Sequence, residues 1–382
     1  MGDALDGIYL DCNATTALAP EVLAAMLPHL QGPEANPASA HGFGRKARQV
    51  LEDSRERLAA LLGAHPDEVL FTSGATEANN LALLGLSGEP GSHVLASPIE
   101  HPSVLEPLRV LANRRLDVEF LPVTPGGRVD PETLAARLTP RTRQVACMLV
   151  NHETGVIQPV AEMRKRVRPE IPFHCDAVQA VGKIPVDFRA LGVTTLSLSG
   201  HKFHGPPGIG ALLVQRDAKL RPMLRGGHQQ RGLRPGTEPL ALIVGLTTAL
   251  DLACRQRETR LIQARRLREL LLDHLRRHAG PIAVNGEEGS PYVLNLSFLG
   301  LAGDMVLMAL DLAGVACSTG SACSSGSLRV SPVLQAMGVP DEVLRSALRF
   351  SFSARQKEAE IREAGWRISN VVRRLRADPG GS

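Results

Sequence analysis

Aromatic side chains are scarce in this sequence, because only 3% of its 382 residues are Phe, Trp or Tyr. The apolar fraction is nevertheless 43%, so a sizeable core must be built mainly from Leu, Val and Ala. Lysine is also rare: there are six, and the other cationic residues are arginines spread along the chain. The net charge is +4 and the pI is about 8.8. The sequence nevertheless contains no basic block dense enough to indicate nucleic-acid binding.

Long apolar runs are missing too. The start MGDALDGIYL lacks the basic region and apolar run of a signal peptide, and no stretch is long enough to span a bilayer. We therefore expect a cytoplasmic protein without a membrane partner.

Cysteine pairs of the CxxC type are absent. The six cysteines are residues 12, 147, 175, 254, 317 and 323. Their spacing fits no zinc site, so we expect reduced thiols and no metal. The first four lie in apolar or strand-like segments and Cys317 follows the apolar run LDLAGVA, which predicts structural roles. Cys323 differs, because the surrounding STGSACSSGS cannot bury a thiol.

A strand and helix alternation begins near residue 45. Short β-branched and aliphatic runs predict strands at 68–73, 93–98, 117–122, 144–150, 171–176 and 194–199. Helical patterns fall at 45–63, 75–86, 103–114, 131–138 and 159–168. This alternation predicts an α/β fold with a mostly parallel sheet that is covered on both faces.

The pattern changes toward the C-terminus. Residues 238–279 read as one long helix or two, and a strand near 292–300 and helices near 303–313 and 356–376 follow. These elements predict a smaller α+β domain. We place the large domain at 16–255, and the small domain at 1–15 and 256–382.

Polar groups follow five of the predicted strands, where open parallel sheets bind their ligands. After the strand at 68–73, Gly74 permits a tight turn, and Ala75 and Thr76 begin a helix whose free N–H groups favour an anion. An ordinary helix start looks the same. Glu100 and His101 follow the next strand, where a lone histidine is more often structural than catalytic.

The other three strand ends add more chemistry. NHETG, with His152, follows the strand at 144–150. Asp176 ends the strand at 171–176, with Gln179 close behind, and a carboxylate there is costly unless a cation meets it. Ser199, His201 and Lys202 follow the strand at 194–199.

Together these groups match the needs of pyridoxal phosphate. Its phosphate needs a helix N-terminus and hydroxyls, its aldehyde needs a lysine, and its ring nitrogen needs a carboxylate that keeps it protonated. Each motif alone is ambiguous, whereas their joint spacing is much less so.

The chain resembles the cysteine desulfurases, in particular the group with the longer loop around the catalytic cysteine. The motifs that carry the resemblance are YLDCNATT (9–16), NPAS (36–39), FTSGATEANN (71–80), EHPSV (100–104), NHETGVIQPV (151–160), DAVQAVGK (176–183), SGHKFHGPPGIGAL (199–212), RGLRPGTE (231–238), STGSAC (318–323) and LRFSFS (348–353). The resemblance covers nearly the whole chain. It implies a fold-type I, aspartate-aminotransferase-like architecture and a homodimer.

The resemblance also implies a role for each matching residue. Cofactor binding is implied for Lys202 as the Schiff-base lysine, Asp176 at the ring nitrogen, Gln179 at the ring hydroxyl, His101 stacked on the ring, Ala75, Thr76, Ser199 and His201 around the phosphate, and Thr237 at the phosphate of the other subunit's site. Arg349 would bind the substrate carboxylate, and His101 could help to move protons.

Cys323 would be the nucleophile. Lys202 would remove the α-proton of L-cysteine, and the thiolate would take the sulfur as a persulfide while alanine leaves. The sulfur would pass to an acceptor protein, such as an iron–sulfur scaffold, or to a thiolation pathway. A loop of Ser and Gly suits a thiol that must serve both the pocket and the surface.

Three positions depart from the family pattern. His152 stands where asparagine is usual, next to the cofactor or substrate carboxylate, and we expect it to keep a hydrogen bond and add a pH-sensitive charge. Ser353 and Ala354 replace the usual Gly-Arg, and GGHQQ (226–230) departs from the usual glycine-rich stretch.

Three alternatives stay open. A selenocysteine lyase shares nearly every cofactor residue. A non-catalytic dimeric sulfur carrier or scaffold would not need Lys202, Asp176 and His101 together, and a related aminotransferase or hydrolase would not need Cys323.

Overall fold

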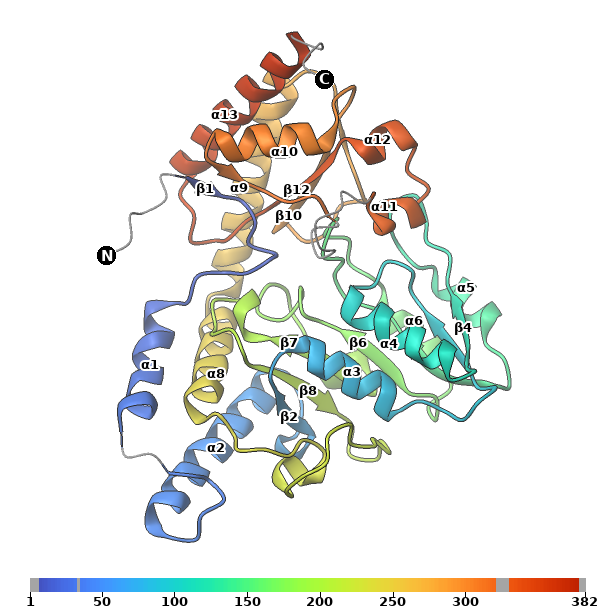
Figure 1. Ribbon diagram of the computed structural model, residues 1–382, viewed down its shortest axis with the longest axis vertical. Coiled ribbons are helices and arrows are strands. Elements are labelled where there is room, and N and C mark those ends of the chain that lie inside the picture. The colour runs from blue at the N-terminus through green and yellow to red at the C-terminus, as the bar shows by residue number, and fades with distance from the viewer. Residues whose placement is uncertain (1–6, 33–34, 321–329, 378–382) are drawn as a thin grey trace.

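The protein is built around two main sheets, each with a core of its own. The computed structural model describes residues 7–32, 35–320 and 330–377. In Figure 1 the larger sheet and its helices lie below the smaller sheet and the two long helices that cover it. The predicted α/β class is confirmed.

The larger sheet has seven strands in the order β2-β8-β7-β6-β5-β3-β4. These are β2 (Val69–Thr72), β8 (Gly210–Val214), β7 (Thr195–Ser199), β6 (Phe173–Asp176), β5 (Thr142–Ala146), β3 (His93–Ala96) and β4 (Asp117–Phe120). Only β8 runs antiparallel to its neighbours. The carboxyl ends of the other six strands therefore meet at one edge.

Helices cover both faces of this sheet. They are α1 (Pro20–Gln31), α2 (Gly42–Leu61), α3 (Ala75–Gly85), α4 (Pro102–Asn113), α5 (Pro131–Arg137), α6 (Val160–Arg166), α7 (Phe188–Leu191) and α8 (Leu240–Arg255), with the 3₁₀ turns η1 (Pro66–Glu68), η2 (Gly200–Lys202) and η3 (Gln229–Gly232). Alternate strand residues face opposite cores: Leu95 packs with the α2 and α8 side, whereas Val94 and Ala96 pack with the α4 side.

The smaller sheet has the order β12-β10-β9 and is antiparallel. Its surroundings are β1 (Ile8–Tyr9), α9 (Arg257–His278), β9 (Ile282–Val284), β10 (Val293–Phe298), α10 (Gly303–Leu312), β11 (Val315–Ala316), α11 (Pro332–Ala336), α12 (Asp341–Arg345), β12 (Ala347–Ser351) and α13 (Glu358–Ala377). Strand β1 pairs with β11, and Leu10 joins the core of this sheet. The N-terminal segment thus runs from the smaller sheet toward the larger one.

Two features differ from or refine the sequence predictions. Strand β8 was not expected, because the preceding GPPGIG indicates only a turn, and it inserts antiparallel between β2 and β7. Residues 238–279 form two helices that meet at Gln256, where the backbone leaves helical geometry. The predicted domain boundary falls at this junction. None of the helices in the described part of the chain has the length and apolar character that a membrane crossing requires.

Candidate active site

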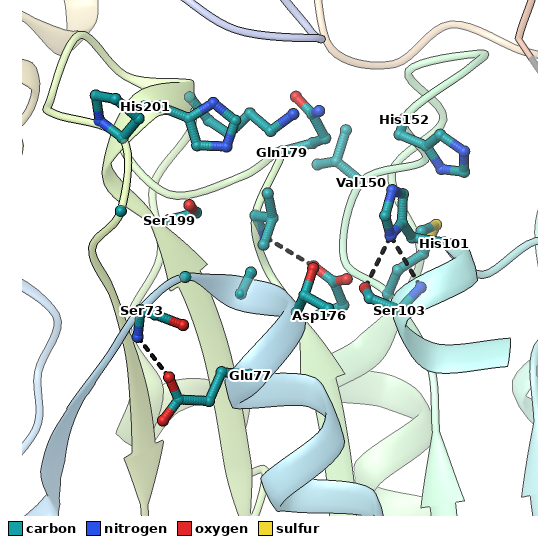
Figure 2. A pocket seen from close by; sticks show the side chains of 18 residues that line it. Ser73, Glu77, His101, Ser103, Val150, His152, Asp176, Gln179, Ser199 and His201 are labelled. Carbon is teal, nitrogen blue, oxygen red and sulfur yellow. Dashed lines mark hydrogen bonds between the residues drawn. The ribbon is translucent and has the colours of Figure 1, made fainter. Parts of the chain in front are cut away.

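A cavity of about 380 Å³ opens where the parallel strands end. Its wall includes nine of the residues that the sequence selected: Ala75, Thr76, His101, His152, Asp176, Gln179, Ser199, His201 and Lys202. Figure 2 shows His101, Asp176, Gln179 and Ser199 converging from the ends of three strands, β3, β6 and β7. The shared carboxyl edge of the sheet is what brings them together.

One end of the cavity is suited to an anion. Gly74 precedes α3 with a φ of 156°, which favours glycine, and the first N–H groups of α3 have no partner within the helix. Ser199 and His201 lie on the same wall. Gly210 of β8 packs so closely that a Cβ there would be 2.8 Å from the Gly74 Cα. The unexpected strand therefore helps to form this anion cradle.

The carboxylate of Asp176 is held as an acceptor by buried groups. Its Oδ2 accepts from Asn79 Nδ2 at 2.8 Å and its Oδ1 accepts from the Val178 N–H at 3.0 Å. Asn79 Oδ1 is 3.0 Å from His174 Nε2. Burial lowers the pKa of His174 to about 3, so this histidine is neutral and donates from one ring nitrogen only. An ionised carboxylate in this position can accept a hydrogen bond from a protonated ring nitrogen.

His101 is fixed as one tautomer by its position at the start of α4. Its Nδ1 accepts from the Ser103 N–H at 3.1 Å and lies 2.8 Å from Ser103 Oγ. Asn79 in turn donates to that hydroxyl at 2.9 Å, which leaves the hydroxyl proton for His101. The ring therefore carries its proton on Nε2. Burial, and to a smaller degree Lys202 and Arg349, lower its pKa although Asp176 opposes this.

His152 is partly buried beside His101, and its Nδ1 atom is buried without a partner among the described residues. Burial, followed by the charges of His101, Arg349 and Lys202, lowers its pKa well below the usual value. The expectation of a pH-sensitive charge at this position is therefore wrong, since desolvation keeps the ring neutral. Its free ring nitrogen is available to a ligand of the cavity.

Lys202 lies in η2, directly after β7. Its Nζ donates to the backbone carbonyls of Asn13 and Ala14 at 2.6 and 2.8 Å. Asn13 belongs to the motif YLDCNATT, in which no role could be assigned to it from the sequence. Its side chain also donates to the His152 carbonyl, and its N–H donates to Ser351 Oγ of β12. Asn13 thereby connects the N-terminal segment to both sheets.

Two of the predicted residues that the structure describes, Arg349 and Thr237, are not in the cavity wall. Arg349 of β12 bonds Asp11 Oδ1 at 2.7 Å and the His152 carbonyl at 3.1 Å, so it lies directly behind His152. Thr237 is exposed. Cys323 lies outside the described residues. Their predicted roles stay predictions.

The two substituted positions near the entrance also have structural partners. Ser353 Oγ is 3.0 Å from His204 Nε2, and Ala354 follows it in the wall of a second, much smaller cavity. That cavity also contacts Lys202 and Lys183. No role for Lys183 could be inferred from the sequence.

The donors and acceptors of the main cavity fit pyridoxal phosphate. A helix N-terminus with hydroxyls is suited to the phosphate, Lys202 to the aldehyde, and Asp176 to the ring nitrogen. The unpartnered Nδ1 of His152 marks a place where a polar group is still needed.

Comparisons with known proteins agree with this geometry. Residues 8–363 match the family described as Aminotransferase class-V. Cysteine desulfurase IscS of Dictyoglomus turgidum is 39% identical over 375 residues, which cover 97% of this chain and 95% of that protein.

Solved structures are similar as well. One described as a NifS-like protein is 33% identical, with a TM-score of 0.91 over 97% of this chain and 100% of that chain. Another, described as SspA in complex with cysteine, is 33% identical, with a TM-score of 0.81 over 91% of this chain and 99% of that chain. The expected fold-type I architecture is confirmed by this likeness.

Proposed function

We propose that this chain, which belongs to the class-V aminotransferase family and is a pyridoxal-phosphate-dependent cysteine desulfurase, moves the sulfur of L-cysteine onto Cys323 as a persulfide. The observation that carries the proposal is the convergence of Lys202, Asp176, Gln179 and the α3 N-terminus on one cavity. A non-catalytic scaffold has no need of that arrangement.

Different residues of the cavity are assigned to different parts of the cofactor. The N–H groups of α3, with Thr76, Ser199 and His201, would hold the phosphate, and Asp176 would accept a hydrogen bond from the ring nitrogen. Bound pyridoxal phosphate supplies an electron sink, which makes the α-C–H of an amino acid acidic.

Proton transfer is assigned to Lys202 and His101. The Lys202 Nζ faces the cavity from the end of β7 and takes the α-proton of the amino acid. His101, with its proton on Nε2, donates into the same space. The substrate carboxylate is assigned to Arg349, whose guanidinium also donates to the His152 carbonyl at 3.1 Å.

The sulfur step is assigned to Cys323. Its thiolate forms a bond to the sulfur of L-cysteine, the carbon–sulfur bond breaks with its electron pair going to carbon, and protons complete L-alanine. The enzyme keeps the persulfide, and a sulfur-acceptor protein, such as an iron–sulfur scaffold, receives it in a second reaction.

The test is alanine release from L-cysteine with a reductant present. We expect Cys323→Ala to keep the absorption band of the bound cofactor and to lose alanine release. Cys317→Ala is the matched control, because this thiol packs against the core of the smaller sheet, and it should retain activity. The same assay with L-selenocysteine separates the alternatives: strong turnover of selenocysteine alone, indifferent to Cys323, would mean a selenocysteine lyase.

A homodimer completes the proposal. Thr237 is exposed and lies outside the cavity wall, which fits a residue that serves the other subunit's site. Leu30 of α1 and Phe43 of α2 are also exposed, at 54% and 58%. Mixed dimers of Lys202→Ala and Thr237→Ala chains test this, because one intact site forms only if Thr237 acts across the interface. Mixed dimers that are no more active than the parents would exclude that role.

A further inference from the structure

Lys183 is a buried lysine to which the reaction above gives no role. It lies in the turn that follows β6 and is 5% exposed. Its Nζ donates to Gln179 Oε1 at 2.6 Å and to Asn13 Oδ1 at 3.0 Å, and it lies 5.7 Å from the centroid of the Tyr292 ring. It forms no ion pair with a carboxylate in the described ranges. Burying an amine without a carboxylate partner costs free energy of folding. The two acceptors hold Lys183 in place, but they do not explain why a lysine is buried here.

The contact to Gln179 fixes the orientation of an amide in the cavity wall. A lysine ammonium has donors only, so the Gln179 atom that faces it must be the oxygen. The Gln179 NH₂ group is then turned the other way, and one of its two hydrogens is bonded to the Asn13 carbonyl at 3.1 Å. The second hydrogen is left for the cavity that Gln179 lines.

The contact to Asn13 likewise fixes the orientation of an amide. With Oδ1 bound to Lys183, Asn13 Nδ2 donates to the His152 carbonyl at 3.1 Å. The Asn13 carbonyl accepts from Lys202 Nζ at 2.6 Å. The Lys183 amine therefore fixes the orientation of two side-chain amides, those of Gln179 and Asn13. The backbone carbonyl of Asn13 also accepts from Lys202.

Protonation does not undo this arrangement. Burial, followed by the charge of Lys202, lowers the pKa of Lys183 to about 7. A neutral amine still has two N–H groups, and it needs two for Gln179 and Asn13.

We propose that Lys183 is a positioning residue that holds the NH₂ group of Gln179 toward the cavity, where it donates to an oxygen on the cofactor ring. The proposal rests on the cofactor chemistry of the proposed function. If the amide turned over, its carbonyl oxygen would face the electron-rich ring oxygen and repel it. Lys183 opposes this by donating to the amide oxygen, while the Asn13 carbonyl accepts from the amide NH₂ group.

The test is a double-mutant cycle between Lys183→Met and Gln179→Leu. Apoprotein prepared from the holoenzyme is titrated with pyridoxal phosphate, and the dissociation constant and the absorption spectrum of the complex are recorded. We expect Lys183→Met to weaken binding about tenfold, the loss typical of one hydrogen bond to a charged group. In the Gln179→Leu background the same change should add almost nothing, because the positioned group is gone.

The control is Lys165→Met, which removes the same charge from an exposed position of α6 and should bind like wild type. If Lys183→Met does not yield folded protein, Lys183→Ala makes the same test without the larger side chain. Binding of either variant within about twofold of wild type, or losses that add fully to that of Gln179→Leu, would overturn the proposal. Since cofactor binding is measured without substrate, a failure of alanine release from L-cysteine in wild type would count against the proposed function and not against this role.

Discussion

The imidazole rings of His101 and His152 meet edge to face, with 5.3 Å between their centroids and 79° between their planes. His101 begins α4, and His152 follows β5, so the contact joins two neighbouring strand ends of the sheet. Both side chains are partly buried, and desolvation lowers the pKa of each. Neither can take up a proton easily beside the other, because the charge would be desolvated and close to Lys202 and Arg349.

The first prediction follows for His152→Asn, which restores the amide that is usual in the family. Because burial keeps His152 neutral, the pH profiles of kcat/KM for wild type and variant should run parallel between about pH 6 and 8. Alanine release at a series of pH values measures this. An inflection near neutral pH that is present in wild type and missing in the variant would show that His152 does titrate.

The second prediction concerns Glu100, whose Oε1 accepts from the Met148 N–H at 2.7 Å while its Oε2 has no partner among the described atoms. Burial raises the pKa of this carboxyl from 4.5 to about 8. Between these values the folded state keeps a proton that the unfolded state releases, so Glu100 lowers stability as the pH rises. Glu100→Gln keeps an oxygen for Met148 and never ionises.

We therefore expect the free energy of unfolding of Glu100→Gln to increase relative to that of wild type from about pH 5 to pH 8, so that the variant becomes the more stable of the two as the pH rises. Urea unfolding of the apoproteins at the two pH values measures the difference. A difference that does not change with pH would mean that Glu100 is ionised in the folded protein.

The third prediction compares two adjacent asparagines of α3. Asn79→Ala leaves the buried groups of Asp176, Ser103 and His174 without their shared partner and should cost about 2–4 kcal/mol of stability. It should also weaken cofactor binding, because Asp176 loses a donor. Asn80→Ala removes only a bond to the Thr76 carbonyl at the surface and should stay within about 0.5 kcal/mol of wild type. Equal losses in the two variants would contradict the role given to Asn79.

The fourth prediction concerns the residues on either side of the segment that contains Cys323. Glu153 Oε2 accepts from Ser331 Oγ at 2.5 Å, and a Cβ on Gly320 would come within 1.9 Å of the same oxygen. Gly320→Ala must therefore displace a buried carboxylate, at a cost of about 1–3 kcal/mol. We expect it to reduce alanine release more than cofactor binding.

The control for that experiment is Gly42→Ala at the start of α2, where the nearest atom to a new Cβ is the Arg45 guanidinium at 3.8 Å. Thermal unfolding and alanine release should both stay close to wild type in this variant. Gly320→Ala behaving like Gly42→Ala would show that Glu153 moves aside freely.

Much of the candidate site could be predicted from the sequence, because its groups follow strands directly. Asp176 ends β6, and His201 and Lys202 lie just beyond β7. Strands with continuous apolar runs are recognisable, and a parallel sheet places their ends together. The cofactor could therefore be inferred before any coordinates.

The remainder of the site depended on long-range contacts. Asn13 is brought to Lys202 by a segment that crosses between the two sheets, and Lys183 is brought to the same asparagine. Strand β8 could not be recognised, since a short aliphatic run after a Gly-Pro turn indicates neither its pairing nor its direction. No local pattern carries such information.

The sequence by itself determined the fold class, the family and the residue types of the site, because local periodicity and strand-end chemistry are properties of short segments. The tertiary structure decided the state of those residues. It keeps His152 neutral, orients the amide of Gln179 through Lys183, and holds Asp176 through Asn79. The physical reason is that protonation and amide orientation depend on burial and on partners far away in the chain, which only the packed fold supplies.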